Sequence, residues 1–150
     1  MYALYEGIVL NETDVLYSPL PMYHTAAGLM VTGCAMGEGL STVTRKKFSA
    51  SQFWRDCSTH GVTGAQYIGE IARYLYSTPQ SEYEKKHKLR VMFGNGMRQQ
   101  MWQKFQDRFN IPKICEYYGS TEGNCSVSNL TGEKWGILQM LMKSTNNFSI

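Results

Sequence analysis

Short apolar runs alternate with amphipathic segments along most of the chain. Runs rich in β-branched, aromatic and leucine residues predict five β-strands: 15–18, 40–44, 62–68, 89–93 and 113–118. Apolar residues spaced three or four apart predict helices between them, at 26–36, after 48, at 70–76 and after 96. Repeated strand–helix–strand units imply an α/β fold, with a mainly parallel sheet and flanking helices.

The helix after residue 48 has the clearest start signal. Ser49 fits an N-cap, and Gln52 three residues later completes a capping box, which stabilises a helix start by about 1 kcal/mol. Phe48 and Phe53 are spaced for a hydrophobic staple across this start. Gly61 fits a C-terminal stop, so we predict a helix between these signals.

Two predictions concern burial. The 26–36 segment is rich in small and apolar residues, which indicates a buried helix. Gly28 and Gly33 would each cost that helix about 1 kcal/mol relative to alanine, so tight packing must offset them. Trp54 and Trp102 lie on apolar helix stripes and are expected in the core.

Composition and charge exclude several classes of protein. A hydrophobic fraction of 43% over 150 residues supports one domain with a sizeable core and excludes a disordered chain. The net charge of +3 is too small to indicate a nucleic-acid partner. The basic clusters 45–47 and 85–88 are expected in solvated loops, the second within a charged surface loop at 81–88, rather than at phosphate or lipid-headgroup sites. The four cysteines lack zinc spacing and are expected to be reduced, mostly buried thiols.

Residues 116–124 carry the most specific chemistry. Tyr118 offers a flat face for a purine, and Gly119 lets the backbone approach a ligand closely. Ser120 and Thr121 can donate hydrogen bonds to phosphate oxygens. Glu122 is a hard oxygen ligand suited to Mg²⁺. By themselves these residues fit a nucleotide-phosphate site and, equally, a strand end that runs into a polar turn.

The sequence from Tyr118 to Asn124 resembles the Tyr-Gly-x-Thr-Glu signature of adenylate-forming enzymes. Among them it is most similar to the fatty acid transport proteins, which are also very-long-chain acyl-CoA synthetases. Four more stretches resemble this family in the same order: 17–28, 45–51, 66–70 and 92–98. The resemblance implies that residues 1–129 form part of the large N-terminal AMP-binding domain. Residues 130–150 leave the family pattern as a divergent tail, for which disorder is one interpretation.

The family joins a fatty acid to ATP as an acyl-adenylate and then transfers the acyl group to CoA. The resemblance therefore implies ATP, Mg²⁺ and CoA as cofactors, with Thr121 at the α-phosphate and Glu122 holding Mg²⁺. Tyr118 would stack on adenine, with the Gly94-Asn95-Gly96 turn on the other side of that pocket. The implied nucleotide-binding residues are Gly94, Asn95, Gly96, Tyr117, Tyr118, Gly119, Ser120 and Thr121.

The resemblance also implies a second group of residues, which would bind the fatty acid. His24 would help to orient the acid near its reacting carboxylate, although a lone histidine at this place also fits a structural role. Gln66, Tyr67 and Gly69 would line the acyl channel, and their apolar neighbours fit a core equally well. The expected partners are a long-chain or very-long-chain fatty acid, ATP and CoA, with no nucleic acid.

Parts of the family pattern are not found in these 150 residues. The phosphate-binding loop and the small domain with the catalytic lysine are missing, so we expect the chain by itself to be inactive. Membrane association, at the endoplasmic reticulum or plasma membrane with this domain facing the cytosol, would depend on other parts of the family. Two alternatives remain open: a non-catalytic fatty acid-binding or regulatory protein, and another adenylate-forming acid–CoA ligase.

Overall fold

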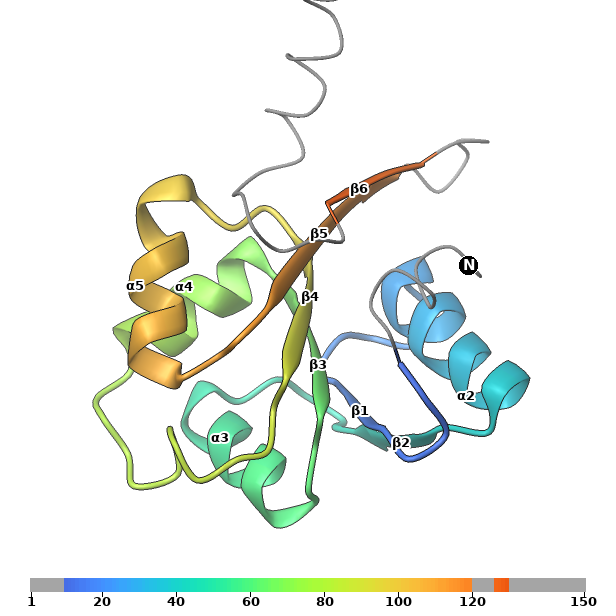
Figure 1. Ribbon diagram of the computed structural model, residues 1–150, viewed down its shortest axis with the longest axis horizontal. Coiled ribbons are helices and arrows are strands. Elements are labelled where there is room, and N and C mark those ends of the chain that lie inside the picture. Colours follow the sequence, from blue (N-terminus) through green and yellow to red (C-terminus); the bar gives the residue numbers. More distant parts are fainter. Residues whose placement is uncertain (1–9, 120–125, 130–150) are drawn as a thin grey trace, which may run out of the picture.

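A six-stranded sheet organises the chain in the computed structural model, which describes residues 10–119 and 126–129 (Figure 1). The strand order is β2-β1-β3-β4-β5-β6. The first five strands are parallel, and β6 is antiparallel to β5. The strands are β1 (Val15–Ser18), β2 (Ser41–Thr44), β3 (Gly64–Ile68), β4 (Val91–Asn95), β5 (Ile114–Gly119) and β6 (Ser126–Asn129).

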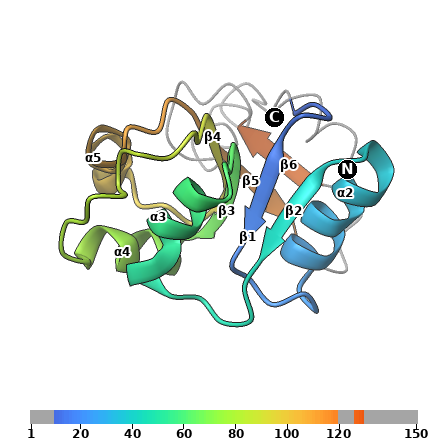
Figure 2. The same ribbon diagram turned by 90° about the horizontal axis from the view of Figure 1, so that it is seen from below.

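Helices cover both faces of the sheet, as Figures 1 and 2 show. One face carries α3, α4 and α5, and the other carries a π-helical segment, η1, that continues directly into α2. The helical elements are η1 (Ala26–Thr32), α2 (Gly33–Glu38), α3 (Ala50–Thr59), α4 (Gly69–Ser77) and α5 (Gln99–Phe109). The predicted α/β class and mainly parallel sheet are confirmed, and all five predicted strands are present.

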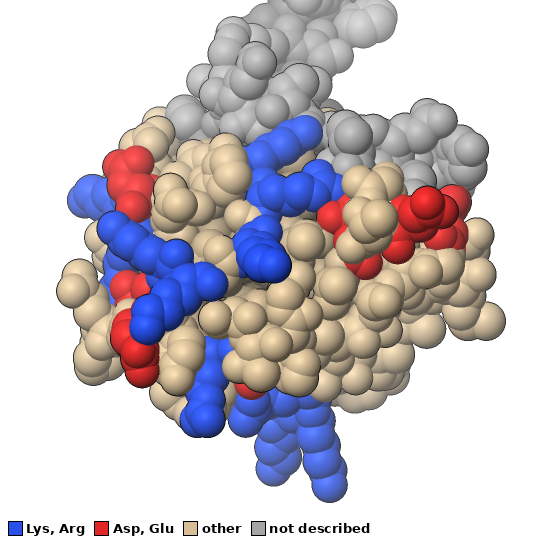
Figure 3. All heavy atoms as spheres, turned by 60° about the horizontal axis from the view of Figure 1, so that its bottom comes forward, with Lys and Arg blue, Asp and Glu red and all other residues tan. Residues whose placement is uncertain are grey.

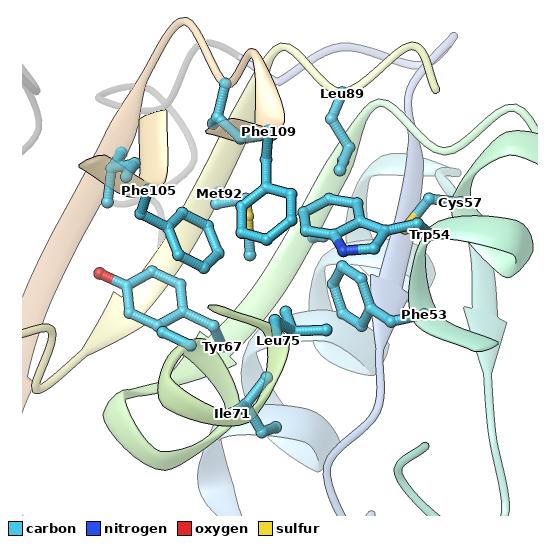
Figure 4. Packing of buried hydrophobic residues seen from close by; sticks show 14 of the residues in the cluster. Phe53, Trp54, Cys57, Tyr67, Ile71, Leu75, Leu89, Met92, Phe105 and Phe109 are labelled. Atoms are coloured by element: carbon cyan, nitrogen blue, oxygen red, sulfur yellow. The ribbon is translucent and has the colours of Figure 1, made fainter. Parts of the chain in front are cut away.

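The main core lies between the sheet and helices α3, α4 and α5 (Figure 4). Trp54 stacks on Phe109 with ring centroids 4.3 Å apart and meets the edge of Phe53 at 4.9 Å. Trp102 is also buried, which confirms the prediction for both tryptophans. A smaller cluster on the opposite face packs Leu16 and other strand residues against η1 and α2.

The prediction of a capping box at the start of α3 is wrong. Ser49 is the N-cap, but its side chain makes no capping hydrogen bond. Its hydroxyl instead lies 3.3 Å from that of Ser51. The start is stabilised by packing, because Phe53 is fully buried and Phe48 packs against the same core. Gly61 does follow the helix end, with a φ of +61°.

The predicted buried helix at 26–36 is only half buried. Ala27, Val31 and Cys34 face the sheet, whereas Leu29 and Met36 are exposed. A Cβ atom at Gly28 would lie 2.3 Å from the carbonyl oxygen of Met22, so the tight packing expected around this glycine is present. Among the described residues, no helix has the length and apolar character needed to span a membrane.

The charged segment 81–88 is a surface turn, as predicted, but two of its side chains anchor it. Glu84 is buried and receives a hydrogen bond of 2.6 Å from Arg108 on α5. The imidazole of His87 stacks on Trp54 at 5.2 Å, with burial lowering its pKa. On the face shown in Figure 3, basic side chains are spread over a wide area, with acidic side chains beside some of them. Cys34, Cys57 and Cys115 are buried, reduced cysteines.

Candidate nucleotide-binding site

The carboxyl ends of β3, β4 and β5 meet at one edge of the sheet. Gly94 on β4 lies opposite Tyr67 on β3 and Glu116 on β5, and Asn95 lies opposite Ile68. The turn after β4 is therefore flanked by the start of α4 on one side and by β5 on the other (Figure 1). Ligands of parallel α/β sheets bind at this edge, so the fold brings the predicted turn to a suitable place.

Glycine is required in and beside this turn because the main chain of the turn packs directly on the main chain of neighbouring elements. A Cβ atom at Gly94 would lie 2.0 Å from the carbonyl oxygen of Tyr67. A Cβ atom at Gly69 would lie 2.1 Å from the carbonyl oxygen of Gly96, which itself has a φ of +77°. Gly69 thus serves as a close contact for the turn, and the sequence alone gave no indication of this contact.

Tyr118 lies on the strand next to this turn and is open to solvent. Its side chain is 62% exposed, and Asn95, Gly96 and Gly119 are exposed as well. An exposed aromatic ring beside an exposed, side-chain-poor turn is a surface that a flat ligand can contact. Tyr117, another predicted nucleotide-binding residue, is instead buried on the opposite face of the sheet, because successive strand residues alternate in direction.

The buried carboxylate of Glu116 on β5 holds the end of the turn through a hydrogen bond. Oε1 of Glu116 accepts hydrogen bonds from the backbone amide of Met97 at 2.7 Å and from the hydroxyl of Tyr67 at 3.2 Å. Figure 4 shows the Tyr67 hydroxyl pointing out of the aromatic cluster, toward β5. Burial raises the pKa of Glu116, although the two hydrogen bonds oppose that shift. Burial also raises the pKa of Tyr67 well above its ordinary value, so this hydroxyl stays protonated.

Gln66 connects the other face of the sheet to the helix that follows His24. Its Oε1 accepts a hydrogen bond of 2.7 Å from the Ser18 hydroxyl. Its Nε2 donates to the carbonyl oxygen of Ala26 at 2.6 Å and to the hydroxyl of Tyr117 at 3.2 Å. Gln66 and Tyr67 are both fully buried, so neither side chain is open to solvent in this structure. Their predicted contact with a fatty acid stays a prediction.

His24 is exposed at the entrance to η1. Its backbone carbonyl accepts hydrogen bonds from the amides of Ala27 at 3.1 Å and Gly28 at 2.8 Å, which starts the helical segment. Its ring lies 4.7 Å from that of Tyr23, which is also exposed. The imidazole can therefore reach a ligand, and the bond between Gln66 and Ala26 ties the start of η1 to β3.

Three predicted residues, Ser120, Thr121 and Glu122, lie outside the described residues. Their roles at the phosphates and at Mg²⁺ stay predictions. Within residues 10–119 and 126–129, no group of three or more His, Cys, Asp or Glu side chains is arranged to hold a metal ion. Metal binding by a single carboxylate together with ATP phosphates does not need such a group.

Comparison with known proteins assigns this arrangement to a family. A protein-family model described as "AMP-binding enzyme" matches residues 1–143. The chain belongs to the AMP-binding enzyme family. It is 48% identical over 124 residues to long-chain fatty acid transport protein 1 of Mus musculus, covering 83% of this chain and 19% of that protein. It is 43% identical over 134 residues to long-chain fatty acid transport protein 3 of Homo sapiens, covering 89% and 20%. The chain thus spans about a fifth of these curated relatives.

Solved structures support the same AMP-binding fold. ATP-bound MatB from Rhodopseudomonas palustris aligns with a TM-score of 0.73 at 19% identity, over 85% of this chain and 25% of that chain. O-succinylbenzoate coenzyme A synthetase from Bacillus subtilis, in complex with AMP, aligns with a TM-score of 0.68 at 17% identity, over 85% and 26%. At these identities the likeness concerns the fold alone.

Proposed function

We propose that this chain is part of an ATP-dependent ligase that joins long-chain or very-long-chain fatty acids to CoA. The observation that carries the proposal is the exposed Tyr118 beside the Gly94-Asn95-Gly96 turn, at the ligand edge of a parallel sheet. The identity of 48% to a long-chain fatty acid transport protein supports a fatty acid as the substrate.

The reaction we propose has two steps at one site. The fatty acid carboxylate attacks the α-phosphorus of ATP, which forms an acyl-adenylate and releases pyrophosphate. The sulfur of CoA then attacks the acyl carbon, which forms the thioester and releases AMP. Both reactants of the first step are anions, so alignment and neutralisation of charge provide most of the catalysis.

The residues of the chain divide between the two substrates. Tyr118 stacks on adenine against the turn at Gly94, with Thr121 donating to the α-phosphate. Glu122 holds Mg²⁺, which would neutralise charge on the phosphates when bound. His24 orients the fatty acid and does not act as a base, because a carboxylate is already ionised at neutral pH.

Cellular role is a further part of the proposal. Curated relatives are named long-chain fatty acid transport proteins, which supports coupling of acyl-CoA formation to fatty acid uptake. We place this part of the protein at the cytosolic side of the endoplasmic reticulum or plasma membrane, where ATP and CoA are available. Attachment to the membrane would come from segments other than the described helices.

A chimeric enzyme tests the catalytic proposal. Residues 10–129 would replace the matching segment of long-chain fatty acid transport protein 1 of Mus musculus, and ATP–pyrophosphate exchange would be measured with palmitate and with very-long-chain acids. We expect activity in the chimera, and a loss on the order of 10²–10³ for Glu122→Ala. The matched control is Glu12→Ala. Glu12 is an exposed acid that precedes the amino end of β1, at the edge of the sheet opposite the candidate site.

The outcomes separate the alternatives. An active chimera whose Glu122→Ala variant exchanges pyrophosphate at the normal rate would refute the role of Glu122. Exchange with coumarate or an amino acid, and none with fatty acids, would indicate a different acid–CoA ligase. Fatty acid binding without exchange would favour a non-catalytic binding protein.

A further inference from the structure

We propose that Glu116 is a positioning residue for the nucleotide, because it holds the turn after β4 at a fixed distance from Tyr118. The role deepens the proposed function and rests on it. Glu116 does not contact the ligand in this scheme. It acts through the backbone of the turn, which forms the wall opposite the tyrosine ring.

The contacts of Glu116 join three elements at one point. Its carboxylate comes from β5, accepts a hydrogen bond from Met97 at the end of the turn, and accepts another from Tyr67 on β3. The side chain is 5% exposed, so water does not replace these bonds. A hydrogen bond from an amide to a carboxylate is roughly twice as strong as one between neutral groups.

The position of Glu116 along β5 connects it to the nucleotide. Residues two apart on a strand point to the same face, so Glu116 and Tyr118 lie on the same side of β5. One strand therefore carries both the ring that would stack on adenine and the carboxylate that fixes the opposite wall. A change in the length of the bond to Met97 changes the width of the space between them.

The other restraints on the turn come from β3 and α4, and Gly94 and Asn95 pair with Tyr67 and Ile68 on β3. On the side of α4 the turn rests on Gly69 through backbone contact, with the Gly96 oxygen facing the Gly69 Cα. That contact stops the turn from moving toward α4 but does not stop it from moving away. The Glu116–Met97 hydrogen bond restrains the turn on the side of β5.

A hydrophobic core alone does not need a carboxylate at this place. Burying a carboxylate is costly unless it is well hydrogen-bonded, and an apolar side chain of similar size would fill the same space without that cost. Two hydrogen bonds converge on Oε1 of Glu116, from the Met97 amide and the Tyr67 hydroxyl, and they offset part of that cost. A buried, hydrogen-bonded acid at the ligand edge is typical of functional sites.

The test uses the 150-residue chain with the variants Glu116→Ala and Glu116→Gln. AMP affinity would be measured by calorimetry, hydrogen exchange at the Met97 amide by NMR, and stability by urea unfolding. We expect Glu116→Ala to weaken AMP binding about tenfold, because partial loss of base stacking has that magnitude, and to accelerate exchange at Met97. Glutamine keeps an oxygen acceptor and the size of the side chain, so it should restore most of both properties.

The matched control is Glu82→Ala, which removes an exposed carboxylate paired with Lys86 in the 81–88 segment. It should leave AMP affinity and Met97 exchange unchanged. If Glu116→Ala does not fold, Tyr67→Phe removes one of the two bonds to the carboxylate and keeps the ring in the core. That variant should weaken AMP binding by a smaller factor and accelerate exchange at the Met97 amide to a smaller extent.

Each result decides between the two proposals. AMP binding that is equally tight in Glu116→Ala, with faster exchange at Met97, would overturn the positioning role and leave the proposed function intact. Unchanged exchange at Met97 would overturn the positioning role as well. A folded wild-type chain that does not bind AMP at millimolar concentration would overturn the positioning role in this chain, whereas the proposed function is decided by pyrophosphate exchange in the chimera.

Discussion

Replacing Gly69 with alanine is the sharpest test of how the turn after β4 is built. The new Cβ atom would lie 2.1 Å from the carbonyl oxygen of Gly96 and 2.8 Å from its carbonyl carbon. Both are backbone atoms, so no side chain can rotate away to make room. Restoring an ordinary contact requires the turn or the start of α4 to move by about 1 Å.

The expected cost follows from two opposing effects. Overpacking of this kind costs about 1–3 kcal/mol, and contact with backbone favours the upper end of that range. Alanine recovers at most about 1 kcal/mol of helix propensity, because Gly69 is the first residue of α4. A net loss of about 2 kcal/mol remains. With a urea slope of about 2 kcal/mol per molar, the unfolding midpoint should fall by about 1 M.

Urea unfolding followed by tryptophan fluorescence measures this loss, since Trp54 and Trp102 are both buried. The matched control is Gly37→Ala on α2, where a Cβ atom meets nothing within 4 Å. That variant should gain up to about 1 kcal/mol from helix propensity. Equal midpoints for the Gly69 and Gly37 variants would refute the backbone contact between α4 and the turn.

Two further predictions concern buried charges. Arg108→Met should destabilise the chain by about 3–5 kcal/mol in thermal or urea unfolding. The change leaves buried Glu84 without its cation and removes the hydrogen bond to the carbonyl oxygen of Thr78. A loss below about 1 kcal/mol would contradict this prediction. Burial acts to raise the pKa of Asp14, but hydrogen bonds from Arg90 and Thr63 lower it below the ordinary 3.8 overall. The resulting stability is present above pH 3.8 and lost as pH falls through the folded-state pKa, so Asp14→Asn should flatten the acid limb of a pH titration of unfolding; an unchanged acid limb would argue against it.

The elements that the sequence predicted correctly are those decided by local patterns. The run at 15–18 matches β1 at both ends, and the parallel sheet follows from alternating strands and helices. The capping box failed because residue types alone do not fix where a hydroxyl points: the Ser49 hydroxyl lies beside that of Ser51 and makes no capping bond. The burial of the 26–36 helix was overestimated because apolar composition does not specify how much of a helix faces the sheet.

The support of the candidate site depends on contacts that are distant in sequence. Glu116 and Met97 are 19 residues apart, and Gly69 and Gly96 are farther apart still. Neither pair has a local pattern, so the sequence alone assigned no role to Glu116. The turn at 94–96 was predictable, because glycines that follow an apolar strand are typical of the ligand edge of such sheets. Whether Ser120, Thr121 and Glu122 complete that site stays a prediction.

Adjacent residues on β3 belong to separate networks on opposite faces of the sheet. Tyr67 contacts Glu116 behind the turn, whereas Gln66 contacts Tyr117 and the helix entrance near His24. Under the proposed function, the first network serves the nucleotide and the second serves the acid. The two share main chain but no side chain, so related enzymes could diversify their acid preference by mutations on one face while keeping the machinery for ATP on the other.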